Sequence, residues 1–282
     1  MAEPLFRVSN LHLSLPDFSR KPLFGAAPRI NILKGLSFEL PTGEITGIVG
    51  ESGSGKTTLG RVLVRLLSAS SGQVLFNGND IARLDEEQLK PLRRDLQMIF
   101  QDPMSSLNPR HTVGRIVATP MKRYGLPNAE ARALEMLERV GLPAAFAKRY
   151  PHELSGGQRQ RVGIARAVAL EPAFILADEI VSGLDVSSQA QVLALLKDLA
   201  ADMHLTIAFI SHDLSVIRSV CSQLIVLDQG LIAEAGSCQA IFDAPQSDAT
   251  RALIDAIPLP EIDDDWFKRD AASGLPSDRR HV

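Results

Sequence analysis

The sequence lacks the features of a secreted or membrane-spanning chain. It has only two cysteines, Cys221 and Cys238, without CxxC spacing, so a disulfide framework or a structural zinc site is not expected. Its longest apolar runs, such as 174–177, are strand-length, whereas a membrane helix needs roughly 18 residues. Residues 1–7 hold no basic stretch followed by an apolar run, so we expect no signal peptide. These absences predict a soluble chain in a reducing cytoplasm that reaches a membrane only through a partner.

An excess of positive charge is missing as well. The chain carries 33 acidic and 30 basic residues, a formal net charge of -3, so no overall positive field attracts nucleic acid. No nucleic-acid partner is therefore expected. The 282 residues, 45% hydrophobic and 22% charged, have a globular composition that suits one large domain or two small ones. No internal repeat is present in the sequence, so we expect one copy of each functional domain.

Short apolar runs alternate with helical patterns along most of the chain. Residues 5–15 and 30–40 are typical of an antiparallel β region. A short apolar run that ends in glycines lies at 45–49, and continuously apolar runs, as in strands covered on both faces of a parallel sheet, lie at 174–177 and 205–210. Helical spacing is seen at 189–201 and at Leu59, Val62, Leu63, Leu66 and Leu67. This β-α-β alternation predicts an α/β fold.

Residues 112–170 are instead mainly helical, and 129–140 is the clearest helix. The shift in pattern predicts an inserted α-helical subdomain at approximately 102–170. We assign residues 1–245 to one domain and residues 246–282 to a C-terminal extension and tail. Residues 262–282 are polar and aperiodic, which is typical of a solvated tail.

A phosphate-binding loop follows the run at 45–49. Residues 50–57 fit G-x-x-x-x-G-K-[ST] between a predicted strand and a predicted helix. Glycines let the backbone curl so that successive N–H groups face an anion, and the helix N-terminus adds partial positive charge. Lys56 is expected to reach the β- and γ-phosphates of a nucleotide, and the Thr57 hydroxyl to ligate Mg²⁺. The predicted nucleotide-binding residues are Gly50, Ser52, Gly53, Ser54, Gly55, Lys56, Thr57 and Thr58.

Three polar side chains stand at the carboxyl ends of later apolar runs. Asp178 and Glu179 follow the run at 174–177, and His212 follows the run at 205–210. Because ligands bind at this edge of open α/β sheets, we expect these side chains to meet the nucleotide there. Asp178 suits Mg²⁺ coordination, and Glu179 suits polarising the attacking water. His212 could contact the γ-phosphate, although a lone histidine at a strand end is more often structural.

The segment Leu154-Ser155-Gly156-Gly157-Gln158 resembles the signature motif of the ABC ATPase family. The phosphate loop alone leaves kinases, GTPases and helicases open, and the signature narrows these to ABC proteins. Ser155 can cap a helix whose N-terminus faces an anion. The resemblance spans about residues 5–260 and implies a P-loop NTPase (RecA-like) core that hydrolyses ATP. It also implies head-to-tail dimers in which the signature covers the ATP held by the other subunit, through Ser155, Gly156, Gly157 and Gln158.

Further motifs follow in the order of the family. Gln101 resembles the Q-loop glutamine, which in the family senses Mg²⁺ and lies near the contact to the membrane subunit. Residues 182–185 resemble the D-loop, and His212 resembles the switch histidine. The resemblance therefore implies Asp185 at the bound nucleotide and three catalytic residues, Glu179, His212 and Gln101. It implies Mg²⁺ ligands at Thr57, Gln101 and Asp178.

Four segments resemble the dipeptide/oligopeptide/nickel branch of ABC importers, namely 100–110, 150–154, 185–191 and 250–253. In that branch two ATPase subunits join two transmembrane permeases, and a periplasmic or extracellular solute-binding protein delivers the cargo. The resemblance implies a peripheral ATPase on the cytoplasmic face of the cell (inner) membrane that powers uptake of a small solute. Peptides are the leading class of cargo, and nickel, glutathione, opines and sugars are alternatives. The resemblance leaves open whether the two ATPase subunits are identical or different.

Some positions depart from the family pattern. Residues 180–181, Ile-Val, replace the usual Pro-Thr, and Gly183 replaces the usual alanine. Residues 246–249 interrupt the usual His-Pro-Tyr stretch. Leu15 stands where an adenine-stacking aromatic residue is expected. The aromatic residues nearby in sequence are Phe18 and Phe24.

Two other kinds of ABC ATPase compete with the importer. An exporter subunit would share the fold and the catalytic residues, and the branch segments favour import over it. A soluble ATPase of DNA repair would carry a long insertion between Gln101 and Ser155, where this chain has a short one. A ribosomal ATPase usually holds two ATPase domains, where this chain has one.

Overall fold

The apolar runs form the middle of a six-stranded sheet in the computed structural model, which describes residues 3–17, 20 and 25–256. The strands β3 (Ile45–Gly50), β7 (Phe174–Asp178) and β8 (Thr206–Ile210) are buried along their whole length. The strands β7 and β8 pair in parallel, as predicted, and β3 pairs in parallel with β8. Their burial fits a parallel sheet, whose crossover helices cover both faces. The order of the sheet is β10 (Leu231–Ser237), β9 (Gln223–Asp228), β3, β8, β7 and β6 (Leu96–Ile99).

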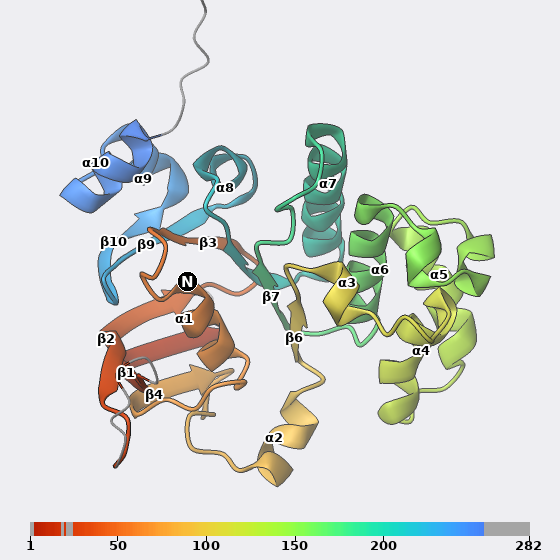
Figure 1. The fold of residues 1–282 in the computed structure, drawn as a ribbon, viewed down its shortest axis with the longest axis horizontal. Coiled ribbons are helices and arrows are strands. Elements are labelled where there is room, and N and C mark those ends of the chain that lie inside the picture. Colours follow the sequence, from red (N-terminus) through yellow and green to blue (C-terminus); the bar gives the residue numbers. More distant parts are fainter. Residues whose placement is uncertain (1–2, 18–19, 21–24, 257–282) are drawn as a thin grey trace, which may run out of the picture.

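The predicted antiparallel region forms a second sheet of four strands (Figure 1). Its order is β2 (Arg29–Leu40), β1 (Phe6–Pro16), β4 (Ser71–Phe76) and β5 (Asn79–Asp80). The ring of Phe6 lies 5.0 Å from that of Phe76 and 4.7 Å from that of Phe174, measured between centroids. Since Phe174 belongs to β7, these aromatic contacts join the two sheets.

Helix α1 (Lys56–Leu63) is shorter than its apolar spacing predicts. The pattern continues through Leu66 and Leu67, but Arg65 adopts a φ of 54° and the helix stops before it. The N–H of Arg65 donates to the carbonyl of Val62, and the N–H of Leu66 donates to that of Arg61. These bonds form a Schellman-type cap, which ends the helix locally. Leu66 is consequently 52% exposed.

The chain between β6 and β7 is mainly helical, as the pattern predicts. Helix α6 (Gly156–Val168) begins after Ser155, whose Oγ accepts the N–H of Gln158 while the Gln158 side chain accepts the N–H of Ser155. This capping box satisfies two backbone donors at the start of the helix. The other helices here are α3 (Pro103–Ser106), α4 (Val113–Arg123), α5 (Ala129–Arg139) and two 3-10 turns, Ala144–Lys148 and Pro151–Glu153. The subdomain boundaries at 102 and 170 stay a prediction.

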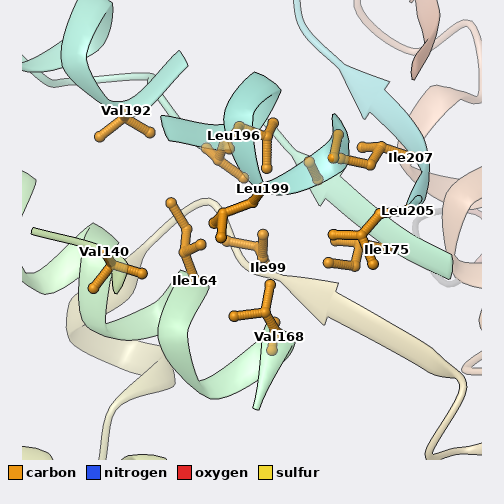
Figure 2. Packing of buried hydrophobic residues seen from close by; sticks show 14 of the residues in the cluster. Ile99, Val140, Ile164, Val168, Ile175, Val192, Leu196, Leu199, Leu205 and Ile207 are labelled. Atoms are coloured by element: carbon orange, nitrogen blue, oxygen red, sulfur yellow. The ribbon is translucent and has the colours of Figure 1, made fainter. Parts of the chain in front are cut away.

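Helices α6 and α7 (Val186–Met203) cover one face of the six-stranded sheet. Figure 2 shows aliphatic side chains of both helices meeting residues of β6, β7 and β8, and all of those labelled are almost fully buried: Ile99, Val140, Ile164, Val168, Ile175, Val192, Leu196, Leu199, Leu205 and Ile207. Burying one such side chain stabilises the fold by about 1.5–3 kcal/mol. The packing therefore attaches α6, which begins at the signature motif and is called the signature helix, to the sheet.

The remaining helices are α2 (Glu86–Leu92), α8 (Leu214–Val220), α9 (Cys238–Asp243) and α10 (Asp248–Asp255). Within the described ranges, no helix is both long and apolar enough to cross a membrane. Phe18 and Phe24 and the predicted tail at 262–282 lie outside the described residues.

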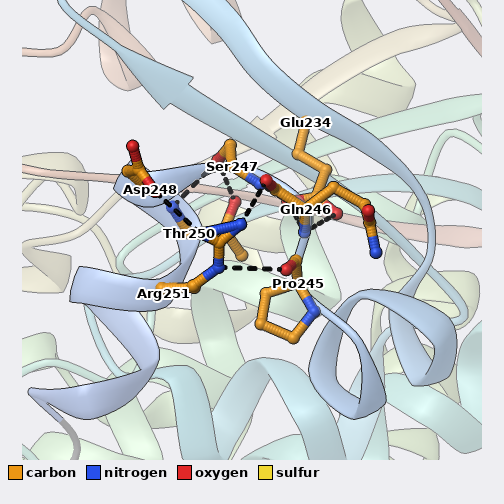
Figure 3. Close-up of polar contacts among 7 residues, drawn as sticks. All are labelled: Glu234, Pro245, Gln246, Ser247, Asp248, Thr250 and Arg251. Atoms are coloured by element: carbon orange, nitrogen blue, oxygen red, sulfur yellow. Dashed lines mark hydrogen bonds and ion pairs between the residues drawn. The ribbon is translucent and has the colours of Figure 1, made fainter.

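The start of the predicted C-terminal extension is bound to β10 by one carboxylate. Glu234 accepts hydrogen bonds from the N–H of Gln246, at 3.0 and 3.1 Å, and from the N–H of Ser247, at 3.1 Å (Figure 3). The Oγ of Ser247 accepts the N–H of Thr250 and thereby caps α10. The Arg251 guanidinium donates to the carbonyl of Gln246 at 2.7 Å. The stretch that departs from the family pattern thus begins a capped helix.

We expect Glu234→Gln to lower the free energy of unfolding by about 1 kcal/mol at neutral pH, because it removes a charged acceptor. Burial alone would raise the pKa of Glu234, but hydrogen bonds from the Thr250 hydroxyl and from backbone N–H groups outweigh it, and the pKa lies below its usual value. Such a group stabilises the fold above its unfolded pKa, and this contribution disappears as the pH falls through the folded pKa.

The difference between Glu234→Gln and the native chain should therefore shrink as the pH falls below about 4, measured by thermal unfolding. Asp243→Asn is the matched control, since the carboxylate of Asp243 accepts a hydrogen bond from the exposed Gln239 side chain. A loss of stability in Glu234→Gln that is equal at pH 7 and at low pH would contradict this account.

Candidate nucleotide-binding site

The loop between β3 and α1 needs glycine at specific points. Gly50, Gly53 and Gly55 have φ values of 147°, 83° and 106°, which favour glycine. A Cβ on Gly50 would lie 2.1 Å from the carbonyl oxygen of Leu227 in β9. The loop can thus pass close to β9 and place the N-terminus of α1 toward the space above it, where an anion is favoured.

A cavity of about 450 Å³ lies over this loop. Its size falls within the range of small-molecule sites in proteins. It is lined by Ile32, Ser52, Gly53, Gly55, Lys56, Thr57, Thr58, Glu179 and His212. Most predicted phosphate-loop residues therefore line one cavity, together with two of the three predicted catalytic residues.

Lys56 is held inside the loop and is only 9% exposed. Its Nζ donates to the carbonyl oxygens of Gly50, at 2.7 Å, and Glu51, at 2.8 Å. Burial lowers the pKa of the Lys56 ammonium, and the nearby charges of Glu179 and Asp178 oppose that change. The ammonium and the loop N–H groups together favour an anionic ligand in the cavity.

Asp178 lies behind the cavity lining and contacts Thr57, which is part of that lining. The Thr57 Oγ1 donates a hydrogen bond to Asp178 Oδ1 at 3.2 Å. Asp178 is 5% exposed, and burial raises the pKa of its carboxyl group, while the hydrogen bond from Thr57 opposes the change. A hydroxyl and a carboxylate are hard oxygen donors, the kind that Mg²⁺ prefers, and a cation would offset the cost of the buried charge. The residues present therefore fit Mg²⁺.

Two polar side chains converge on Glu179. The Nε2 of Gln101 donates to Glu179 Oε2 at 3.0 Å, and Nδ1 of His212 lies 3.5 Å from Glu179 Oε1. Glu179 has a φ of 49°, which is uncommon for a residue other than glycine, and its N–H donates to the carbonyl of Ile210. The carboxyl ends of β6, β7 and β8 thus bring Gln101, Glu179 and His212 together. The parallel sheet predicted this for Glu179 and His212, whereas only the family resemblance pointed to Gln101.

The signature motif lies in a different place. Ser155, Gly157 and Gln158 line a separate cavity of about 300 Å³, together with Ser188 of α7. Asp185 accepts the N–H of Ser188 at 2.9 Å and caps α7. The two cavities share no lining residue. Four further predicted site residues do not line the phosphate-loop cavity but adjoin or contact residues that do: Gly50, Ser54, Gln101 and Asp178. The predicted site residues that lie elsewhere in the chain are Ser155, Gly156, Gly157, Gln158 and Asp185.

The departures between Glu179 and Asp185 fit the fold. Ile180 and Val181 are buried in the core of the six-stranded sheet. Gly183 has a φ of 77°, which favours glycine over alanine. The backbone conformation thus accounts for Gly183, and Ile180 and Val181 are compatible with their buried positions.

Sequence reasoning missed Ile32, which lines the cavity from β2. No motif marks it, because β2 belongs to the other sheet and reaches the phosphate loop only through tertiary packing. Leu15 of β1 pairs with Ile30 of β2, two residues before Ile32. Among the described residues of β1 and β2, Ile32 lines the cavity, and it is aliphatic.

The fold and site agree with comparisons to known proteins. Residues 33–182 match the family described as ABC transporter. Over 251 residues the chain is 48% identical to the "Putative peptide import ATP-binding protein" of Brucella ovis. The matched region covers 88% of this chain and 79% of that relative. It is 46% identical over 261 residues to the glutathione import ATP-binding protein GsiA of Salmonella typhi, covering 91% of this chain and 42% of GsiA.

Solved structures give the same result. The dimeric ATP-binding cassette MJ0796, in a post-hydrolysis state bound to ADP and Pi, is 30% identical with a TM-score of 0.72, covering 83% of this chain and 98% of that one. The protein cbiO1 from Clostridium perfringens, part of the ABC transporter complex cbiONQ, is 27% identical with a TM-score of 0.75, covering 86% and 92%. The chain therefore belongs to the ABC transporter family and is an ATP-binding ATPase. The predicted P-loop NTPase fold and the resemblance to the peptide-importer branch are confirmed.

Proposed function

We propose that the chain is the ATP-hydrolysing subunit of an ABC importer that takes up a small solute, with di- and oligopeptides as the leading class. The observation that carries this proposal is the 48% identity to a Brucella protein named for peptide import, over 79% of that protein. Glutathione is the second candidate, because GsiA is named for glutathione import. Nickel and opine-type solutes remain alternatives within the same branch.

Two subunits are needed to complete each site. The phosphate loop and the signature line separate cavities of one chain, so a signature must come from a second subunit, identical or related. The dimeric state of MJ0796 bound to ADP and Pi supports this arrangement. In the proposed dimer of this chain, Ser155 and the N–H groups at the start of α6 face the γ-phosphate of the ATP bound by the other subunit, with Asp185 beside them.

The residues around the cavity divide the work of ATP hydrolysis. Lys56 and the loop N–H groups bind the β- and γ-phosphates and orient the terminal phosphate. Glu179 orients the attacking water molecule and accepts a proton from it. Gln101 holds the Glu179 carboxylate at 3.0 Å, and His212 lies where it can contact the γ-phosphate. Thr57, Asp178 and Gln101 would hold Mg²⁺, which neutralises charge on the phosphate oxygens when it is bound.

A groove next to the Gln101 loop is the proposed contact to the permeases. It has a volume of about 730 Å³ and runs between α2, β6 and α4. Leu66, Phe100 and Tyr124 line it, together with charged residues of both signs, and Leu66 and Phe100 are exposed. Because Gln101 follows Phe100, a permease segment in this groove would sense the nucleotide site. The chain would thus act as a peripheral subunit on the cytoplasmic face of the cell membrane.

The test is an affinity pull-down of the tagged chain from detergent-solubilised membranes. We expect two permeases to co-purify, with a second ATPase subunit if the two differ. Leu66→Glu should abolish this co-purification, because it replaces an exposed apolar side chain of the groove with a charge, while ATP binding stays native. Leu231→Glu is the matched control, since Leu231 of β10 is 51% exposed and lies outside the groove.

Uptake of labelled dipeptides and of labelled glutathione by the reconstituted complex then separates the two cargo classes.

Recovery of ribosomes or DNA-repair factors without membrane proteins would overturn the transport proposal and leave the ATPase chemistry standing. Recovery of permeases that only expel solute would point to an exporter. Native co-purification by Leu66→Glu would move the permease contact away from the groove.

A further inference from the structure

One arginine of the signature helix contacts the Gln101 loop on both sides of the glutamine. The Arg166 Nη1 donates to the carbonyl oxygen of Ser106 at 2.6 Å. The Arg166 Cζ lies 5.8 Å from the centroid of the Phe100 ring, within reach of a cation–π interaction. Phe100 directly precedes Gln101, and Ser106 ends the short helix α3 that follows it. Arg166 therefore brackets the segment that carries Gln101.

The elements around this loop are all packed on α6. Both β6, which ends at Ile99 just before the loop, and α3, which follows it, contact α6. Burial lowers the pKa of the Arg166 guanidinium, so its charge sits in a partly desolvated place. A guanidinium is planar and carries fixed donors, so it can bond a carbonyl with one edge and face a ring at the same time.

Helix α6 connects this contact to the signature. Ser155 caps the N-terminus of α6, and Arg166 lies eleven residues further along, near its C-terminus. At a rise of 1.5 Å per residue the two are separated by about 16 Å along one helix. Ile164 and Val168 are fully buried beside Arg166, so this end of α6 is packed tightly and cannot turn independently of the rest.

We propose that Arg166 is a positioning residue that couples the Gln101 loop to the signature helix. The position of the Gln101 side chain against Glu179 then determines the position of Ser155. This rests on the proposed function, in which the signature faces the nucleotide of the second subunit. Gln101 bonds to Glu179 in the nucleotide site of its own subunit. Arg166 thus links the water-activating side of one site to the signature that completes the other.

The test compares kcat and KM for ATP in the purified transporter complex. We expect Arg166→Ala to lower kcat by about 10²-fold, as a small misplacement of catalytic groups does, with KM changed less than about 2-fold. KM should hold because Lys56 and the phosphate loop, which bind ATP, do not contact Arg166. Arg166→Lys keeps the charge and a donor but loses the planar fork, so its kcat should be intermediate.

Matched variants separate positioning from a structural role. Arg132→Ala removes a different arginine contact of the helical segment, the 2.7 Å ion pair of Arg132 with Glu171, and should leave kcat native. Phe100→Leu should lower kcat less than Arg166→Ala does. The double variant should be no slower than Arg166→Ala alone, because both single changes break the same link.

A native kcat in folded Arg166→Ala complex, or equal changes in kcat for Arg166→Ala and Arg132→Ala, would overturn the inference. So would fully additive effects of Phe100→Leu and Arg166→Ala. If Arg166→Ala fails to assemble, Arg166→Lys and Phe100→Leu carry the same comparison. Failure of the wild-type complex to assemble with permeases would contradict the proposed function instead, so the two failures are distinguishable.

Discussion

Glu179→Gln is expected to bind ATP with near-native affinity and to lose turnover by about 10³-fold, within the range that a general base contributes. The substitution keeps the size of the side chain and leaves an amide oxygen that can accept the hydrogen bond from Gln101, now 3.0 Å long. It removes the negative charge that attracts a proton from water. Binding should survive because, in the proposed site, the phosphates meet Lys56 and the loop N–H groups, which do not change.

The measurement combines steady-state ATPase activity with size-exclusion chromatography in the presence of ATP. A variant that binds two nucleotides but cannot hydrolyse them should accumulate as a closed dimer, whereas the wild-type chain should reopen. Glu171→Gln is the matched control, because Glu171 forms an exposed ion pair with Arg132 outside the cavity. Normal ATPase activity in Glu179→Gln would remove Glu179 from the role of base.

Lys56→Ala is expected to lose nucleotide affinity by about 10²-fold, the equivalent of one or two charge-assisted hydrogen bonds. The ammonium is 9% exposed and is held at Gly50 and Glu51 within the loop that faces the ligand. Its removal takes away the positive charge that a polyphosphate meets in the cavity. Hydrolysis should fall further than affinity, since the same charge stabilises the transferring phosphoryl group.

Calorimetric titration with a non-hydrolysable ATP analogue measures the affinity of Lys56→Ala directly. Thermal unfolding of the same sample establishes that the variant is folded. Lys90→Ala, on the surface of α2, is the matched control and should bind the analogue as the native chain does. Native affinity in folded Lys56→Ala would contradict the assignment of this cavity to the phosphates.

The parts of the fold that were predictable share one property, which is that a short window of sequence contains the cause. The central strands could be found because strands buried on both faces are continuously apolar, and β3, β7 and β8 are buried throughout. The start of α6 could be found because the Ser155 cap needs only Gln158 beside it. The end of α1 could not, because apolar spacing carries no information about the left-handed Arg65 that stops it.

The candidate site divides in the same way. Amino-acid order by itself determined the phosphate loop, since its glycines and Lys56 all lie within residues 50–56 and the curl of the backbone needs only local torsion angles. It also determined which residue types stand at the ends of the central strands. The roles of these residues in hydrolysis stay predictions until the variants are measured.

Tertiary structure alone decided which of these groups meet. Gln101 and Glu179 are 78 residues apart and touch because β6 and β7 are neighbours in the sheet. Ile32 reaches the cavity because one sheet packs on the other, and Arg166 reaches the Gln101 loop because α6 lies across it. The signature stays out of the phosphate-loop cavity for the same reason. Contacts of this kind depend on strand order and on the packing of distant side chains, which no local window of residues contains.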